Sequence, residues 1–230
     1  MARPYDVGFG SSRMNHMQQA VSLFHPNRNL VAFEHRGGWK LDSIRQHVIG
    51  VLDSGHDVSN THVYIMAGLC DITQMDRFVW GQRNYEEVCF IEEPNEKINI
   101  IKNKFDLLEA SILIRGATPI FATIIPASIK AWNYTRLEQG RTPFLLHHDQ
   151  YEDMESLVND IISDLNFFLI NKNVNNGVAT PHVADQFITH RNGHRRIHFN
   201  RLADGVHPNE EYSAKTGIAL WKAVKKNRNY

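Results

Sequence analysis

Short runs rich in β-branched and aromatic residues alternate with segments of helical periodicity along this chain. The predicted strands are Tyr5–Gly10, Leu30–Glu34, His62–Ala67 and Thr118–Ile125. In the last two runs, apolar residues occupy positions of both parities, as in HVYIMA and IFATII. Strands buried on both faces of a parallel sheet have this pattern, whereas half-exposed strands alternate between apolar and polar residues.

The segments between these runs carry apolar residues at helical spacing. The apolar stripes extend over Leu41–Val51, Ile98–Ile112 and Met154–Phe168. A last helix is expected after Asn209, because acidic residues would occupy its first turn and lysines its last turn. Strands that alternate with helices predict an α/β protein, a three-layer α/β/α sandwich with a mostly parallel sheet.

Two stretches, Met75–Pro94 and Ser128–Gln150, fit neither periodicity. We expect them to be loops or insertions over the edge of the sheet. The chain contains no internal repeat, low-complexity segment or long linker. Residues 1–230 are therefore predicted to form a single domain.

Composition and charge narrow the class of protein. Hydrophobic residues make up 42% of the 230 residues and charged residues 22%, which is typical of a globular chain. The 25 basic residues balance the 25 acidic ones, so the overall field selects neither nucleic acid nor anionic lipid. Cys70 and Cys89 are too few for a disulfide framework, although one bridge is open to them.

The beginning of the chain lacks the apolar core of a signal peptide. No run approaches the roughly 20 apolar residues of a membrane-spanning helix. We therefore expect an intracellular protein, cytoplasmic or nuclear, that does not cross a membrane.

Candidate chemistry follows from where ligands bind in an open α/β sheet, beyond the carboxyl ends of the strands. Gly10–Arg13, Arg36–Trp39 and Gly68–Asp71 follow the first three predicted strands. Near the C-terminus, the apolar stretch Val178–Ile188 precedes Ala203–Pro208. These four segments are expected to meet at one edge of the sheet.

The last segment is the most specific, because Asp204 and His207 lie three residues apart on a tight turn. A carboxylate at this spacing can hold the tautomer of the imidazole and stabilise its protonated form. Ser12, at a strand-to-helix turn, would complete a nucleophile, base and orienting acid. The N–H groups of Ser12 and of Gly37 or Gly38 could bind a developing oxyanion.

The serine after the first strand, the glycine after the second, the Gly68–Asp71 block and the Asp-Gly-Val-His-Pro of 204–208 resemble the SGNH (GDSL-type) hydrolases. The resemblance extends over nearly the whole chain in the right order. It is strongest to divergent members found in metazoan mobile elements and uncharacterised invertebrate or viral proteins, some fused to reverse-transcriptase polyproteins. It implies a flavodoxin-like fold with a five-stranded sheet.

The resemblance also implies a reaction and its residues. The substrate would be a small-molecule or carbohydrate ester, an acetyl ester being one candidate, and neither a cofactor nor a metal is expected. Ser12 would be the nucleophile and Asp204 and His207 the rest of the triad. Gly38 and position 70 would bind the oxyanion, with Gly68 in the same block.

Two departures from the family pattern matter. The family's Gly-Asp-Ser is Gly10-Ser11-Ser12 here, which leaves open whether Ser11 or Ser12 is the exposed hydroxyl. The family's oxyanion asparagine is Cys70, and a thiol is a weak donor. Losing one oxyanion donor typically lowers turnover by roughly a hundred- to a thousandfold. The alternative function is therefore a catalytically inactive module for binding or assembly.

Other motifs allow two interpretations each. Arg13 is either a surface residue or a group over the site that binds an anionic substrate. His147–Asp149 resembles a metal cluster but is interpreted as a loop. Gly8–Arg13 with Glu34 resembles the fingerprint of a dinucleotide-binding site, but Arg13 occupies the position of the third glycine. We therefore rank the dinucleotide-binding interpretation below the hydrolase interpretation. The basic stretch His190–Arg201 is either a nucleic-acid or phosphate patch or a solvated loop.

Overall fold

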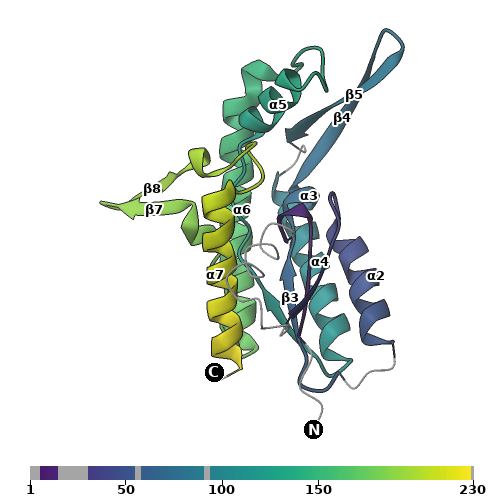
Figure 1. Ribbon diagram of the computed structural model, residues 1–230, viewed down its shortest axis with the longest axis vertical. Helices are drawn as coiled ribbons and strands as arrows, with labels where there is room; N and C mark the ends of the chain where they lie inside the picture. The colour runs from purple at the N-terminus through teal and green to yellow at the C-terminus, as the bar shows by residue number, and fades with distance from the viewer. Residues whose placement is uncertain (1–5, 15–30, 55–57, 91–93, 229–230) are drawn as a thin grey trace.

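A four-stranded parallel sheet forms the centre of the molecule (Figure 1). The structure is a computed structural model, and it describes residues 6–14, 31–54, 58–90 and 94–228. The strands are β1 (Asp6–Gly10), β2 (Val31–His35), β3 (His62–Met66) and β6 (Thr118–Phe121), in the order β2-β1-β3-β6. All three pairings are parallel. All four predicted strands are present, but β3 ends at Met66 and β6 already ends at Phe121 rather than at Ile125. Tyr5 and Leu30 lie outside the described residues.

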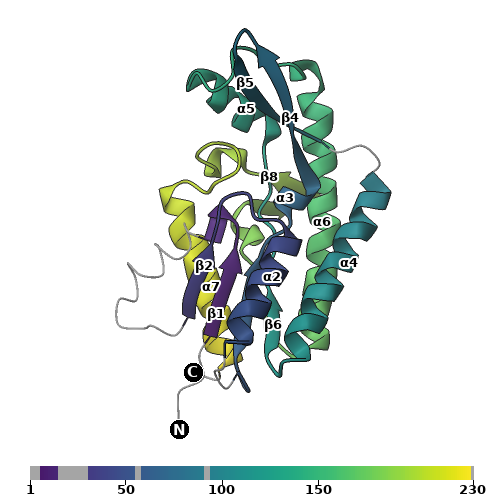
Figure 2. The same cartoon turned by 90° about the vertical axis from the view of Figure 1, so that its right-hand side faces the viewer.

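Helices cover both faces of this sheet (Figure 2). Helices α2 (Leu41–Leu52), α4 (Pro94–Leu113) and α6 (Tyr151–Asn175) pack on one face, and α7 (Glu210–Asn227) packs on the other. In β3, Val63 and Ile65 belong to the first core, whereas Tyr64 and Met66 belong to the second. Burial on both faces explains why apolar residues occur at both parities, and it confirms the three-layer α/β/α architecture.

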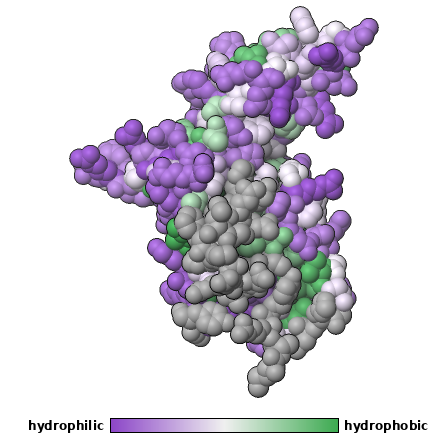
Figure 3. Space-filling model, viewed as in Figure 1, coloured by the Kyte–Doolittle hydropathy of each residue, from purple (hydrophilic) through white to green (hydrophobic). Residues whose placement is uncertain are grey.

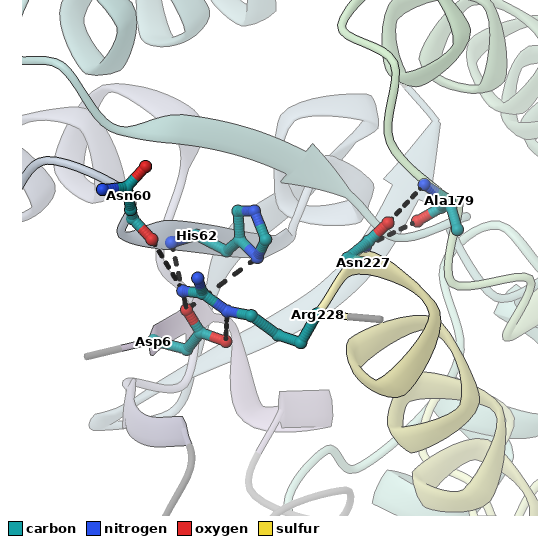
Figure 4. Close-up of polar contacts among 6 residues, drawn as sticks. All are labelled: Asp6, Asn60, His62, Ala179, Asn227 and Arg228. Carbon is teal, nitrogen blue, oxygen red and sulfur yellow. Dashed lines mark hydrogen bonds and ion pairs between the residues drawn. The ribbon is translucent and has the colours of Figure 1, made fainter. Parts of the chain in front are cut away.

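The C-terminal end of α7 is tied to the start of the sheet (Figure 4). The Arg228 guanidinium forms an ion pair with Asp6, whose carboxylate also accepts the N–H of His62 at 3.1 Å. Next to it, the Asn227 side chain accepts the N–H of Ala179 and donates to its carbonyl. These contacts lie at the end of the sheet opposite the carboxyl ends of the strands.

The prediction of a fifth strand is wrong for the described part of the sheet. The chain after β6 continues extended through residues 122–127 without a strand partner on its outer side. The stretch Val178–Ile188 approaches it only locally, where Thr123 N–H donates to the Pro181 carbonyl at 3.1 Å. That stretch instead forms a 3-10 turn, Ala184–Gln186, and leads into a separate hairpin.

Three asparagines of α6 replace the missing neighbour. Each asparagine binds one backbone residue of the extended segment: its side-chain oxygen accepts the N–H of that residue, and its side-chain amide donates to the carbonyl of the same residue. The pairs are Asn173 with Phe121, Asn166 with Ile124 and Asn159 with Ala127. Seven residues of helix rise about 10.5 Å, and three residues of extended chain span about 10 Å. The seven-residue spacing of the asparagines therefore matches every third residue of the extended segment.

The stretch Met75–Pro94, which was expected to be a loop or an insertion over the edge of the sheet, is largely an antiparallel hairpin. Strands β4 (Thr73–Trp80) and β5 (Arg83–Phe90) project beyond the carboxyl ends of the central strands, next to α5 (Ile129–Glu138) (Figure 1). The Asn133 side chain of α5 binds both the N–H and the carbonyl of Val88. Because most of β4 is exposed, its sequence lacks the apolar alternation that predicts a strand.

The remaining elements are short. Helix α3 (Leu69–Ile72) follows β3, and the 3-10 turns His148–Gln150 and Phe199–Arg201 precede α6 and the last site segment. Strands β7 (Ile188–Arg191) and β8 (His194–Ile197) form a second hairpin. Among the described helices, none combines the length and apolarity needed to cross a membrane.

We predict that each of these asparagines contributes more to the free energy of unfolding than the surface area it buries suggests. Asn166→Ala leaves the buried N–H and carbonyl of Ile124 without partners, which should lower the free energy of unfolding by about 1–3 kcal/mol. Urea denaturation followed by circular dichroism measures this. The control is Asn171→Ala, an exposed position on the same helix, which should change stability much less. Equal losses in both variants would contradict this role for Asn166.

Candidate active site

Three side chains from opposite ends of the chain form one continuous hydrogen-bonded array. Ser12 Oγ lies 2.7 Å from His207 Nε2, and His207 Nδ1 lies 2.7 Å from Asp204 Oδ2. Ser12 lies two residues after the end of β1, at the start of a helical segment described as far as Met14. Asp204 and His207 lie on the turn before α7. The parallel topology brings these segments together at the carboxyl edge of the sheet, as the sequence predicts.

The Asp204 carboxylate organises this turn. Its Oδ1 accepts the backbone N–H groups of Val206 at 3.0 Å and His207 at 2.7 Å, while Oδ2 faces the imidazole. Burial alone would raise the pKa of Asp204, but the hydrogen bonds from the His207 side chain and from the two N–H groups outweigh it and lower the pKa. The carboxylate is therefore ionised at neutral pH and holds the imidazole ring in place.

Gly205, between these residues, lets the turn approach α5 closely. Its φ is +87°, and a Cβ there would lie 2.5 Å from the Ser128 carbonyl oxygen and 2.6 Å from the Trp132 backbone nitrogen. The Gly205 carbonyl accepts the Ser128 N–H at 2.7 Å. The Trp132 ring in turn lies 5.6 Å, centre to centre, from the His207 ring. Only glycine fits this position without moving the backbone of the turn that carries Asp204 and His207.

The structure decides between the two neighbouring serines. Ser11 is buried, with 7% of its surface exposed, and its N–H faces the Met66 carbonyl. Ser12 is partly exposed and lines a cavity. The hydroxyl that meets the imidazole is therefore that of Ser12.

Arg13 is neither a surface residue nor a group over the site, so that expectation was wrong. Only 3% of its surface is exposed, and its guanidinium donates to the carbonyls of Val206 at 2.9 Å, Ile125 at 2.6 Å and Pro126 at 3.2 Å. Burial lowers its pKa to about 10, so it remains charged at neutral pH. Arg13 thus joins the start of the Ser12 segment to the turn that carries Asp204 and His207 and to the chain after β6.

A cavity of about 600 Å³ opens beside Ser12 and His207. Most of its wall is apolar, contributed by Leu69, Met75, Val88, Ala127, Ile129, Trp132 and Val206. Met75 and Val88 are cross-strand partners on one face of the β4–β5 hairpin. The walls from the hairpin and α5 carry no local signal in the sequence, because their approach to Ser12 depends on contacts between residues distant in sequence.

The other predicted site residues divide into two groups. Gly38 and Cys70 line the cavity. Burial raises the pKa of the Cys70 thiol, so the thiol is neutral at pH 7. Gly68, with φ at +118°, is not among the described lining residues, and a Cβ there would lie 2.7 Å from Ile124 Cδ1. Its role is to let α3 start in close contact with the core.

Solved structures with low sequence identity share this architecture. The GDSL-like lipase from Bacteroides thetaiotaomicron is 13% identical, with 97% of this chain and 88% of that chain covered and a TM-score of 0.63. A member of the lipolytic G-D-S-L family from Veillonella parvula is 11% identical, with 96% and 98% covered and a TM-score of 0.57. An acetyl xylan esterase is 12% identical, with 95% and 99% covered and a TM-score of 0.55.

The chain has the SGNH-hydrolase fold. No family model and no curated protein matches the sequence. The SGNH fold explains why the segments after β1, β2 and β3 meet the turn before α7, since all four lie at the carboxyl edge of one parallel sheet.

Motifs outside the site have structural partners within this SGNH fold. His147 Nε2 lies 3.0 Å from Asp76 Oδ2, and no group of three His, Cys, Asp or Glu side chains among the described residues could hold a metal ion. Glu34, the acid of the dinucleotide fingerprint, binds His47 instead. Both cysteines are free thiols.

Proposed function

We propose that this chain is a divergent SGNH hydrolase that cleaves carboxylic esters through Ser12, His207 and Asp204. The observation that carries the proposal is the unbroken array from Ser12 Oγ through the His207 ring to Asp204, with Ser12 and His207 both lining an apolar cavity. An imidazole placed between a serine and a carboxylate is the arrangement that activates a hydroxyl as a nucleophile.

The reaction proceeds in two displacements. His207 Nε2 accepts the hydroxyl proton as Ser12 Oγ attacks the ester carbonyl, and the protonated ring then gives this proton to the leaving alcohol. Water loses a proton to His207 as it attacks the acyl-enzyme, and the returning proton releases Ser12. Asp204 holds the proton on Nδ1 and stabilises the imidazolium in both steps.

Two backbone donors are candidates for the oxyanion. The Ser12 N–H lies at the start of a helical segment, where unpaired N–H groups favour negative charge, and Gly38 lines the same cavity. The family's third donor is replaced by Cys70, whose neutral thiol is a weak hydrogen-bond donor. The proposed enzyme is therefore slow for its fold.

The cavity favours an acyl group longer than the acetyl group considered from the sequence. About 600 Å³ of mostly apolar space is far more than a two-carbon acyl group fills, and burying each further methylene contributes about 0.8 kcal/mol. The wall formed by Met75, Val88 and Ile129 would contact the acyl chain. We propose a medium-chain acyl ester as substrate.

The first test of this function is ester hydrolysis. The protein should hydrolyse a p-nitrophenyl ester, and Ser12→Ala and His207→Ala should each lower kcat at least a thousandfold, because the triad acts as a unit. Ser11→Ala is the matched control and should retain activity, since the buried Ser11 hydroxyl is outside the array. Wild type and Ser12→Ala hydrolysing at the same rate would refute the mechanism.

The second test concerns chain length. We expect kcat/KM to rise from the acetate to the hexanoate or octanoate ester. Met75→Trp should fill the cavity and reverse this order, whereas Val79→Trp on the same hairpin, which is exposed and outside the cavity, should leave it unchanged. A profile that peaks at acetate in the wild type would contradict the proposed acyl pocket.

Cys70 also favours a second candidate, an SGNH-fold module that binds or assembles without catalysis. The variant Cys70→Asn separates the two functions, because restoring a strong donor to an assembled site should raise kcat by roughly a hundred- to a thousandfold. Cys70→Ala serves as the control and should leave kcat close to the wild-type value. No measurable turnover in either the wild type or Cys70→Asn would support the inactive module.

A further inference from the structure

The β7–β8 hairpin projects from the body of the molecule (Figure 1). Its strands pair only with each other in the described sheets, and a two-residue turn, Asn192–Gly193, with φ of 50° and 77°, joins them. A short turn of this kind gives a well-defined two-stranded ribbon. The basic stretch His190–Arg201 is therefore largely an ordered ribbon rather than an unstructured solvated loop.

The ribbon and its base carry one sign of charge. No acidic residue occurs between Asp185 and Asp204, whereas this interval contains four arginines and three histidines. Among the described residues, no ion pair involves Arg191, Arg195 or Arg196. The space-filling view shows the projecting region as strongly hydrophilic (Figure 3). The neutral whole-chain charge thus hides a local concentration of positive charge.

The register separates the two faces of the ribbon. Ile188 pairs with Ile197, and His190 with Arg195, on the face whose Arg195 approaches the Asn159 carbonyl of α6 at 3.5 Å. The opposite face carries the pairs Thr189 with Arg196 and Arg191 with His194, and all four of these residues are exposed. The solvent-facing side therefore presents two arginines and a histidine.

Positive groups continue from the base of the ribbon along α7. The Arg201 guanidinium lies over the Tyr212 ring at 4.8 Å, and the Lys215 ammonium lies over the same ring at 4.2 Å. Lys215 also pairs with Glu211 at 2.6 Å. Lys215 also lines a groove of about 570 Å³ together with Lys222 and Lys226, and Asp185 lies at the same groove. Cationic side chains thus continue from the base of the ribbon along α7 as far as Lys226.

We propose that the exposed face of the β7–β8 ribbon, with the adjoining surface of α7, binds the phosphate backbone of nucleic acid. Like charges placed on one ribbon without acidic partners destabilise it, and a polyanion relieves that repulsion while releasing counterions. A membrane surface fits less well, because the exposed face offers no apolar side chain for insertion, and Ile188 and Ile197 lie on the other face. The spacing of cations over an extended surface suits a linear chain of phosphates.

The test is direct binding of a labelled oligonucleotide. Fluorescence anisotropy with a 20-nucleotide oligouridylate, and with a duplex DNA of the same length, is measured with the full chain at 50 and 200 mM KCl. We expect salt-sensitive binding that weakens about tenfold in Arg191→Gln/Arg196→Gln. For the single strand, the slope of log K against log salt should fall by about 1.4, since two phosphate contacts are lost.

Three controls make the result specific. Arg83→Gln/Arg141→Gln removes the same charge from exposed positions elsewhere and should leave the affinity nearly unchanged. Arg191→Lys/Arg196→Lys should retain most of the binding, because phosphate contacts tolerate lysine. Thermal melting shows whether each variant is folded. Ser12→Ala should bind as the wild type does, so this inference stands or fails separately from the esterase.

Several outcomes would overturn the proposal. These are no binding of either oligonucleotide at 50 mM KCl, an equal loss of affinity in the Arg83/Arg141 control, or binding to phosphatidylserine vesicles without binding to nucleic acid. The last result would assign the ribbon to an anionic lipid surface instead.

Discussion

The buried backbone of residues 121–127 is the constraint on which the rest of the site depends. This segment leaves the sheet after β6, and its N–H and carbonyl groups must find partners, because no fifth strand among the described residues pairs with it. Asn159, Asn166 and Asn173 bind three of its residues, and Arg13 binds the carbonyls of two more. These side chains thus supply the hydrogen bonds that a neighbouring strand would otherwise make. They are buried polar groups themselves, so all of them must be paired.

The same contacts also position Ser12 and His207, two residues of the proposed triad. Arg13 also binds the Val206 carbonyl, so one guanidinium links the residue after Ser12 to the turn that carries His207. The chain that these groups hold leads directly into α5, whose start packs against Gly205. Because each link is a hydrogen bond to backbone, the distance between Ser12 and His207 depends little on the rotamers of flexible surface side chains.

The two hairpins, β4–β5 and β7–β8, contribute to different surfaces of the molecule. The β4–β5 hairpin is anchored by Asn133 and by the Glu87 carboxylate, which accepts the N–H groups of Leu146 and His147, and it contributes a wall of the cavity. The β7–β8 ribbon stands away from the cavity, although its base leads through a 3-10 turn into the Asp204 turn. Proposed catalysis and proposed polyanion binding therefore share one chain segment but not one surface.

The sequence by itself determined the central strands, the principal helices and the order of the site segments, because apolar periodicity and turn residues act locally. It also brought Ser12, Asp204 and His207 into one hypothesis. Only the tertiary structure decided that Ser12 rather than Ser11 faces the imidazole, that Arg13 is buried, and that α6 asparagines replace a fifth strand. These outcomes depend on which distant backbone groups need partners, and that need exists only after the chain has folded.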